Sequence, residues 1–157
     1  SLCETVGMRL RRDGQAGSCV TIQLRTSDFE TRSHQTRLAS ATNVTGELYQ
    51  AACALLDQAW DRKTPLRQLG VSVTQLADGT LRQYSLFDAA DYARQEKLDT
   101  AVDALREKFG EGALFRAALL HSDERMAGGL HKKRRTGITK PIEDEAARIR
   151  KKYGNND

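Results

Sequence analysis

The spacing of apolar residues along the first half of the chain predicts a helix, two strands, a second helix and a third strand. The helices are expected over residues 2–12 and 44–61, where apolar residues recur every three or four positions. The strands are expected over residues 20–25, 32–38 and 69–75, where apolar and polar residues alternate or polar residues dominate. Short connections make the first two strands an antiparallel hairpin.

Local signals set the ends of these elements. Asp13-Gly14 and Gly17 are expected to break the chain between the first helix and the first strand. Thr42 or Asn43 is expected to cap the second helix, because a short polar side chain accepts a bond from the first helical N–H groups. Pro65 is expected to stop that helix, and Asp78-Gly79 to end the compact part.

This order of elements predicts an α+β fold with helices on one face of the sheet. One further strand in front would complete βαββαβ, the ferredoxin-like split unit, in which that leading strand lies in the middle of the sheet. The chain opens at Ser1 without an initiator methionine, and we interpret it as a piece of a longer protein that lacks this strand. Unpaired strands attract a partner. A strand-exchanged homodimer, or residues 113–120 of the same chain, would then fill the gap.

The uncovered face of this sheet is small and polar. An antiparallel sheet with one solvated face is ordinary, and composition alone favours that interpretation. Hydroxyl groups, an arginine and main-chain N–H groups also suit a sugar–phosphate backbone. The residues expected on this face are Thr21, Gln23, Arg25, Gly70, Ser72 and Thr74.

The second half of the chain predicts one more helix and a basic tail. A helix is expected over residues 91–109, with Gly110 as its stop and an apolar face to be buried on the domain or on a partner. The whole surplus of +4 lies in residues 123–157, and such a tail either binds nucleic acid or is a solvated end. The apolar face of the helix expected over 91–109 consists of Leu98, Ala101, Val102, Leu105 and Phe109. The expected divisions are a domain over 1–80, a linker over 81–90, a helical extension over 91–122 and a flexible tail over 123–157.

Several kinds of site are excluded by what the sequence contains. The chain has three cysteines, an odd number, and no CxxC pair, which disfavours a disulfide framework or a zinc site. This predicts buried thiols in a reducing cytoplasm for Cys3, Cys19 and Cys53. No window approaches a membrane span. The three histidines, His34, His121 and His131, are too scattered for a metal site. No catalytic triad or phosphate-binding glycine loop occurs.

Five segments in order carry a resemblance to a known family. They are the helix end Arg9-Leu10-Arg11, the strand VTIQLRTSDF, the strand with Thr31-Arg32-Ser33 and Thr36-Arg37-Leu38, the helix with paired leucines, and Arg67 to Val73. Together they resemble the little-finger domain of bacterial Y-family translesion DNA polymerases, the polymerase IV and error-prone repair group. Residues 98–120 resemble the C-terminal extension of the same polymerases.

The resemblance implies a domain that grips DNA and does no chemistry. It implies no catalytic residue and no cofactor in this chain. Magnesium is expected in a palm domain elsewhere in the parent protein. That parent is expected to be a nucleotidyltransferase that serves DNA repair and the SOS response. Ser122-Asp123-Glu124 is therefore interpreted as a polar linker, not a palm motif. The residues expected to contact the primer–template backbone are Arg25, Thr26, Ser27, Arg32, Ser33, His34, Thr36, Arg37 and Gln68.

A second motif follows the domain and resembles the peptide that binds the bacterial sliding clamp. Leu86 and Phe87 are adjacent apolar anchors for a groove on a partner, and Gln83 suits a small polar site. The alternative is that both anchors pack back onto the domain. The motif consists of Gln83, Tyr84, Ser85, Leu86 and Phe87.

Two other functions stay open at this point. One is a protein-interaction module with a ferredoxin-like sheet and a basic docking tail, without nucleic acid. The other is an RNA-binding sheet of the RRM type, which needs exposed aromatic residues on its central strands. Residues 20–25 and 69–75 contain no aromatic residue, which disfavours it.

Overall fold

A computed structural model describes residues 1–79, 89–110, 113–114 and 116–117 of the chain. Within them the expected order of helices and strands is confirmed, although each strand is longer than expected. The elements are α1 Leu2–Arg12, β1 Gln15–Thr26, β2 Thr31–Thr42, α2 Thr45–Ala59, β3 Leu66–Asp78 and α3 Ala89–Phe109.

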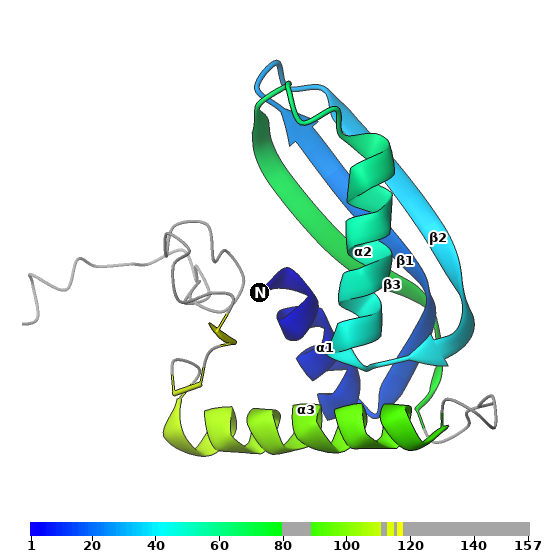
Figure 1. Ribbon diagram of the computed structural model, residues 1–157, viewed down its shortest axis with the longest axis vertical. Coiled ribbons are helices and arrows are strands. Elements are labelled where there is room, and N and C mark those ends of the chain that lie inside the picture. Colours follow the sequence, from blue (N-terminus) through cyan, green and yellow to red (C-terminus); the bar gives the residue numbers. More distant parts are fainter. Residues whose placement is uncertain (80–88, 111–112, 115, 118–157) are drawn as a thin grey trace, which may run out of the picture.

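The three strands form one antiparallel sheet, and α1 and α2 cover one of its faces (Figure 1). This confirms the α+β class and is consistent with a ferredoxin-like little-finger domain. The strand order is β2-β1-β3, with β1 in the centre.

The expected gap in the middle of the sheet is wrong. β1 is long enough to pair with β2 along one edge and with β3 along the other, from Gln15 opposite Asp78 to Thr26 opposite Leu66. In the described sheet, neighbouring strands pair directly and leave no room for an inserted strand. The reason for expecting a strand-exchanged homodimer therefore disappears. Of residues 113–120, Arg116 pairs with Glu4 of α1 instead of extending the sheet.

The core lies between the covered face of the sheet and the two helices. Alternate residues of β1 point inward, as the sequence pattern predicts, and α2 presents one apolar stripe to them. The buried cluster consists of Cys3, Leu10, Val20, Ile22, Leu24, Leu48, Ala52 and Leu55. Val71 and Val73 of β3 pack against it.

Two glycines at the start of β1 have different roles. Gly14 ends α1 with a left-handed φ of 64°, as expected for a break. Gly17 does not break the chain; it lies within β1. A Cβ atom at Gly17 would lie 2.2 Å from Cγ1 of Val73, so the close approach of β3 requires a residue without a side chain.

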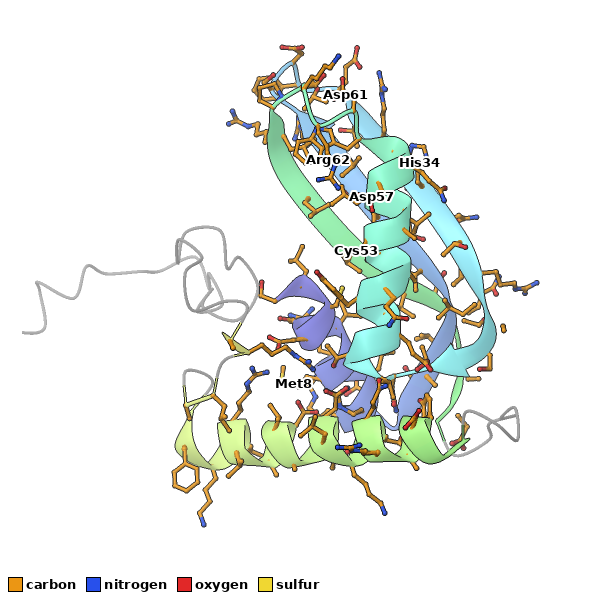
Figure 2. All side chains as sticks on the ribbon, viewed as in Figure 1. Met8, His34, Cys53, Asp57, Asp61 and Arg62 are labelled. Atoms are coloured by element: carbon orange, nitrogen blue, oxygen red, sulfur yellow. The ribbon has the colours of Figure 1, made fainter. Side chains whose placement is uncertain are left out.

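All three cysteines are free. Cys3 and Cys19 are buried as expected, and burial raises the pKa of the Cys3 thiol. Cys53 is half-buried on α2 (Figure 2).

The helix α3 lies across the end of the domain (Figure 1). It docks through polar side chains. The Arg11 guanidinium of α1, whose side chain is 9% exposed, donates to Asp103 at 2.7 Å and to Asp99 at 3.2 Å. Arg116 bridges Glu4 and Asp99 at 2.8 and 3.1 Å. Buried charges are stable only when paired in this way, so these ion pairs fix the position of α3.

The apolar face of α3, which was expected to be buried, is largely exposed. Leu98, Leu105 and Phe109 are 59%, 41% and 64% exposed, whereas Tyr92, Asp99 and Arg106 on the other side are buried. The predicted helix and its stop at Gly110, which has a φ of 96°, are confirmed. The prediction that the apolar face of α3 is buried against the domain is wrong for the described residues. The ion pairs with Arg11 turn the acidic face of α3 toward the domain instead.

Three sequence predictions fall outside the described residues. They concern the clamp-binding motif Gln83–Phe87, the linker Ser122-Asp123-Glu124, and the basic tail over 123–157.

Candidate nucleic-acid interface

The uncovered face of the sheet collects polar side chains from all three strands. Residues directly opposite each other on neighbouring strands share a face. Gln23 lies opposite Ser33 on β2 and opposite Gly70 on β3. Thr21 lies between Gln35 and Ser72 in the same way. The polar, small face expected from the sequence is therefore present.

Two arginines mark the ends of this face. Arg25 lies opposite Gln68 and Thr31 near the tip of the sheet, and Arg37 lies opposite Cys19 near the other end. These positions lie six residues apart along β1, or about 20 Å of strand. Arg37 is exposed, and its Nε donates to Oε1 of Gln75 at 3.0 Å.

The register divides the nine residues expected to contact DNA between two faces. Arg25, Ser33, Arg37 and Gln68 lie on the uncovered face. Arg32, His34 and Thr36 lie opposite Leu24, Ile22 and Val20, which point into the core, so they lie on the helix-covered side at the exposed edge strand β2. Thr26 is also on that side, and Ser27 lies in the turn.

A hollow of about 210 Å³ lies on the helix-covered side near the tip of the sheet. Arg32 and Thr26 line it together with Trp60, next to the C-terminal end of α2. Arg32 is also paired with Glu30 at 3.1 Å. Figure 2 shows Asp57, Asp61 and Arg62 at this same end of α2. A flat DNA backbone laid on the uncovered face would not reach into this hollow.

The tip of the sheet brings Arg25 together with two residues that the sequence analysis did not assign to DNA contact, Phe29 and Arg67. The guanidinium carbons of Arg25 and Arg67 lie 5.1 and 4.7 Å from the ring centroid of Phe29. Arg25 pairs with Gln68 and Thr26 with Leu66, so Arg67 is the extra residue of a β-bulge. Alternation alone would have placed Arg67 on the covered side, and no local sequence signal marks the bulge.

Two kinds of feature are absent from the described ranges. No group of three or more metal-ligating side chains occurs among these residues. In the same part of the chain, no helix is long and apolar enough to span a bilayer.

Comparison with known proteins identifies the family of the chain. A model of the impB/mucB/samB family C-terminal domain matches residues 1–86. DNA polymerase IV of Clostridium acetobutylicum is 35% identical over 125 residues, which are 80% of this chain and 31% of that protein. DNA polymerase IV 2 of Bacillus subtilis is 37% identical over 122 residues, 76% of this chain and 29% of that protein.

A third relative extends this similarity beyond these two bacteria. DNA polymerase IV of Caulobacter vibrioides is 37% identical over 113 residues, 72% of this chain and 28% of that protein. The chain thus spans less than a third of the length of these relatives. The family match over more than half of the 157 residues, together with these relatives, shows that the chain belongs to the impB/mucB/samB family, whose C-terminal domain it matches.

Proposed function

We propose that this domain holds the sugar–phosphate backbone of primer–template DNA on the uncovered face of its sheet. The observation that carries the proposal is the register, which sets Arg25 and Arg37 about 20 Å apart on one face with hydroxyl and amide groups between them. One full turn of duplex is about 34 Å long, so this span exceeds half a turn. Contacts of this kind fix the position of a duplex and carry no sequence information.

The parent protein is proposed to be a translesion DNA polymerase, since the relatives are named DNA polymerase IV. In that proposal the chain contributes no catalytic residue and no cofactor, and magnesium belongs to the palm. We propose that the parent protein acts in the cytoplasm, in DNA repair and in the SOS response.

We also propose that Gln83–Phe87 tethers the polymerase to the sliding clamp. The support is the sequence Gln-Tyr-Ser-Leu-Phe directly after the domain. Adjacent large apolar side chains are typical anchors for a groove on a partner protein.

Two arginines on β2 provide the test of DNA binding. Arg37 lies on the uncovered face, whereas Arg32, five residues earlier, lies on the covered side and is paired with Glu30. Arg37→Ala and Arg32→Ala remove the same charge from the same strand in the full chain. The affinity for a plain primer–template duplex is measured for both variants over a series of salt concentrations.

Arg37→Ala is expected to weaken every duplex alike and to lower the slope of log K against log salt by about one. Arg32→Ala is expected to leave that slope nearly unchanged. Equal effects of the two variants would show that the uncovered face is not the binding surface. Wild-type binding that does not depend on salt would exclude a backbone grip altogether.

One observation favours the second candidate, a protein-interaction module: the exposed apolar stripe of Leu98, Leu105 and Phe109 on α3. The salt series discriminates between the two functions, because a module without nucleic acid would show no duplex affinity in any variant.

A further inference from the structure

Phe29 has a backbone conformation that its side chain does not favour. Its φ is 66°, in the left-handed region, where a bulky residue is a genuine outlier. The N–H of Phe29 donates to the carbonyl of Thr26 at 3.1 Å, and the N–H of Thr26 donates to the carbonyl of Glu30 at 3.0 Å. These bonds close a three-residue hairpin connection, which ordinarily has glycine at this position.

Core packing does not explain the phenylalanine. Its side chain is 56% exposed and does not belong to the buried cluster. A strained residue that packs into no core indicates a role other than stability.

The ring of Phe29 instead contacts two cations from different strands. Arg25 at the end of β1 and Arg67 at the bulge of β3 lie 5.1 and 4.7 Å from its centroid. Each distance is within the range of a cation–π contact. The N–H of Ser27 donates to the carbonyl of Pro65 at 3.0 Å and ties the hairpin connection to the start of β3. The turn thus holds both guanidinium groups beside one ring.

The two carboxylates of the turn contact groups other than Arg25 and Arg67. Glu30 is paired with Arg32 at 3.1 Å, and Asp28 accepts a hydrogen bond from the Ser27 hydroxyl. Among the described residues, no carboxylate forms an ion pair with Arg25 or Arg67. The Nε atom of Arg25 is buried and has no hydrogen-bond acceptor among the described residues. Two like charges held together with free donors form a site for an anion.

We propose that Arg25 and Arg67 form a phosphodiester-binding site at the tip of the sheet, and that Phe29 is the residue that positions them. The proposal rests on the DNA-binding function proposed above and adds Phe29 and Arg67 to it. The ring holds both guanidinium groups in place before the DNA arrives, so less side-chain freedom is lost on binding. The strain at Phe29 is retained because only an aromatic ring provides this contact.

Phe29→Gly separates this role from a structural one. Glycine adopts a positive φ without strain, so this variant is expected to unfold at the same or a higher urea concentration than the wild type. Its affinity for a primer–template duplex is expected to fall about tenfold, with a smaller salt slope. Phe29→Tyr keeps the ring and is expected to bind as the wild type does. A merely structural phenylalanine would lose stability and affinity together.

The experiment uses the full chain and measures duplex binding by fluorescence anisotropy. Arg67→Ala is expected to lose affinity as Phe29→Gly does, and the double variant is expected to lose less than the two losses combined, because both changes disrupt one site. Inorganic phosphate is a second probe: competition only far above the concentration of duplex phosphate is expected, since a lone ion lacks the contacts along the sheet.

Each contrary outcome has a distinct meaning. If Arg37→Ala weakens duplex binding but Phe29→Gly does not, the tip site is wrong and the proposed function stands. If neither variant changes binding, both proposals are wrong. If Phe29→Tyr loses as much affinity as Phe29→Gly, the ring does not position the arginines.

Discussion

The carboxylate of Asp99 on α3 accepts a hydrogen bond of 2.7 Å from the backbone N–H of Thr45 in the first turn of α2. The N-cap residue of α2 is Val44, which has no side chain able to accept such a bond. The first N–H groups of a helix have no partner within it, and a negative charge there is favourable. A residue 54 positions later in the chain therefore caps α2.

Asp99→Ala is expected to lower the free energy of unfolding by about 3 kcal/mol. The variant removes the cap and one of the carboxylates paired with Arg11, but Asp103 remains as a partner for that arginine. Urea unfolding followed by circular dichroism measures the change. Glu107→Ala, at an exposed position of the same helix, is the control and should change stability by less than about 0.5 kcal/mol. Equal stability of the two variants would show that α3 does not cap α2.

Gly17→Ala and Gly70→Ala are expected to have opposite effects, although both introduce one methyl group into the sheet. At Gly17 the new Cβ would lie 2.2 Å from Cγ1 of Val73, and overpacking of this kind costs about 1–3 kcal/mol. At Gly70 the nearest atom lies 3.8 Å away, so the lower chain entropy of alanine dominates and the domain gains about 0.5 kcal/mol. Thermal unfolding of both variants checks the signs. Two losses of similar size would contradict the close β1–β3 approach.

The connection between α2 and β3 is expected to weaken in acid. Hydrogen bonds from the backbone N–H groups of Thr64 and Lys63 lower the pKa of Asp61 below its ordinary value of 3.8. Because folding lowers this pKa, the ionised carboxylate stabilises the fold above pH 3.8, and the contribution is lost as the pH falls through the lower folded value. An NMR titration of the carboxyl carbon is expected to show a midpoint below 3.8. A midpoint at or above that value would contradict these bonds.

The local pattern of the sequence predicts the elements but not their partners. Alternation at Val20, Ile22 and Leu24 correctly identifies β1 and its buried face. The neighbours of β1 depend on pairing between residues far apart, such as Gly17 with Leu76, and no spacing within β1 contains that information. The expected central gap was wrong for this reason.

The helix α3 shows the same limit in another form. Apolar periodicity predicts its ends but selects Leu98 and Leu105 as the buried side. The buried side is set by Asp99 and Asp103, which meet Arg11 from the other end of the chain. At the tip, Arg25 was expected from the sequence to contact DNA. The bulge at Arg67 and the left-handed Phe29 have no counterpart in the hydrophobic pattern, so these two residues could only be found in the structure.

The clamp motif gives the last prediction. Replacing both Leu86 and Phe87 by alanine is expected to abolish binding to the sliding clamp, because these side chains are the proposed anchors of the peptide. A short segment that becomes ordered on binding loses entropy, so the wild-type Kd is expected to be on the order of micromolar. Calorimetry with the purified clamp measures the loss, and affinity for the primer–template duplex should persist.

Leu81→Ala is the matched control for the clamp motif, since it removes an apolar side chain just outside the pentapeptide and should keep clamp affinity. Unfolding of the double variant, or loss of its duplex affinity, would place Leu86 and Phe87 in the core of the domain instead of on the clamp. Full clamp affinity in the double variant would move the contact to another segment, and the basic residues over 131–135 would then be the next to test. The two measurements together separate a tether from a structural element, because a tether contributes to clamp binding alone.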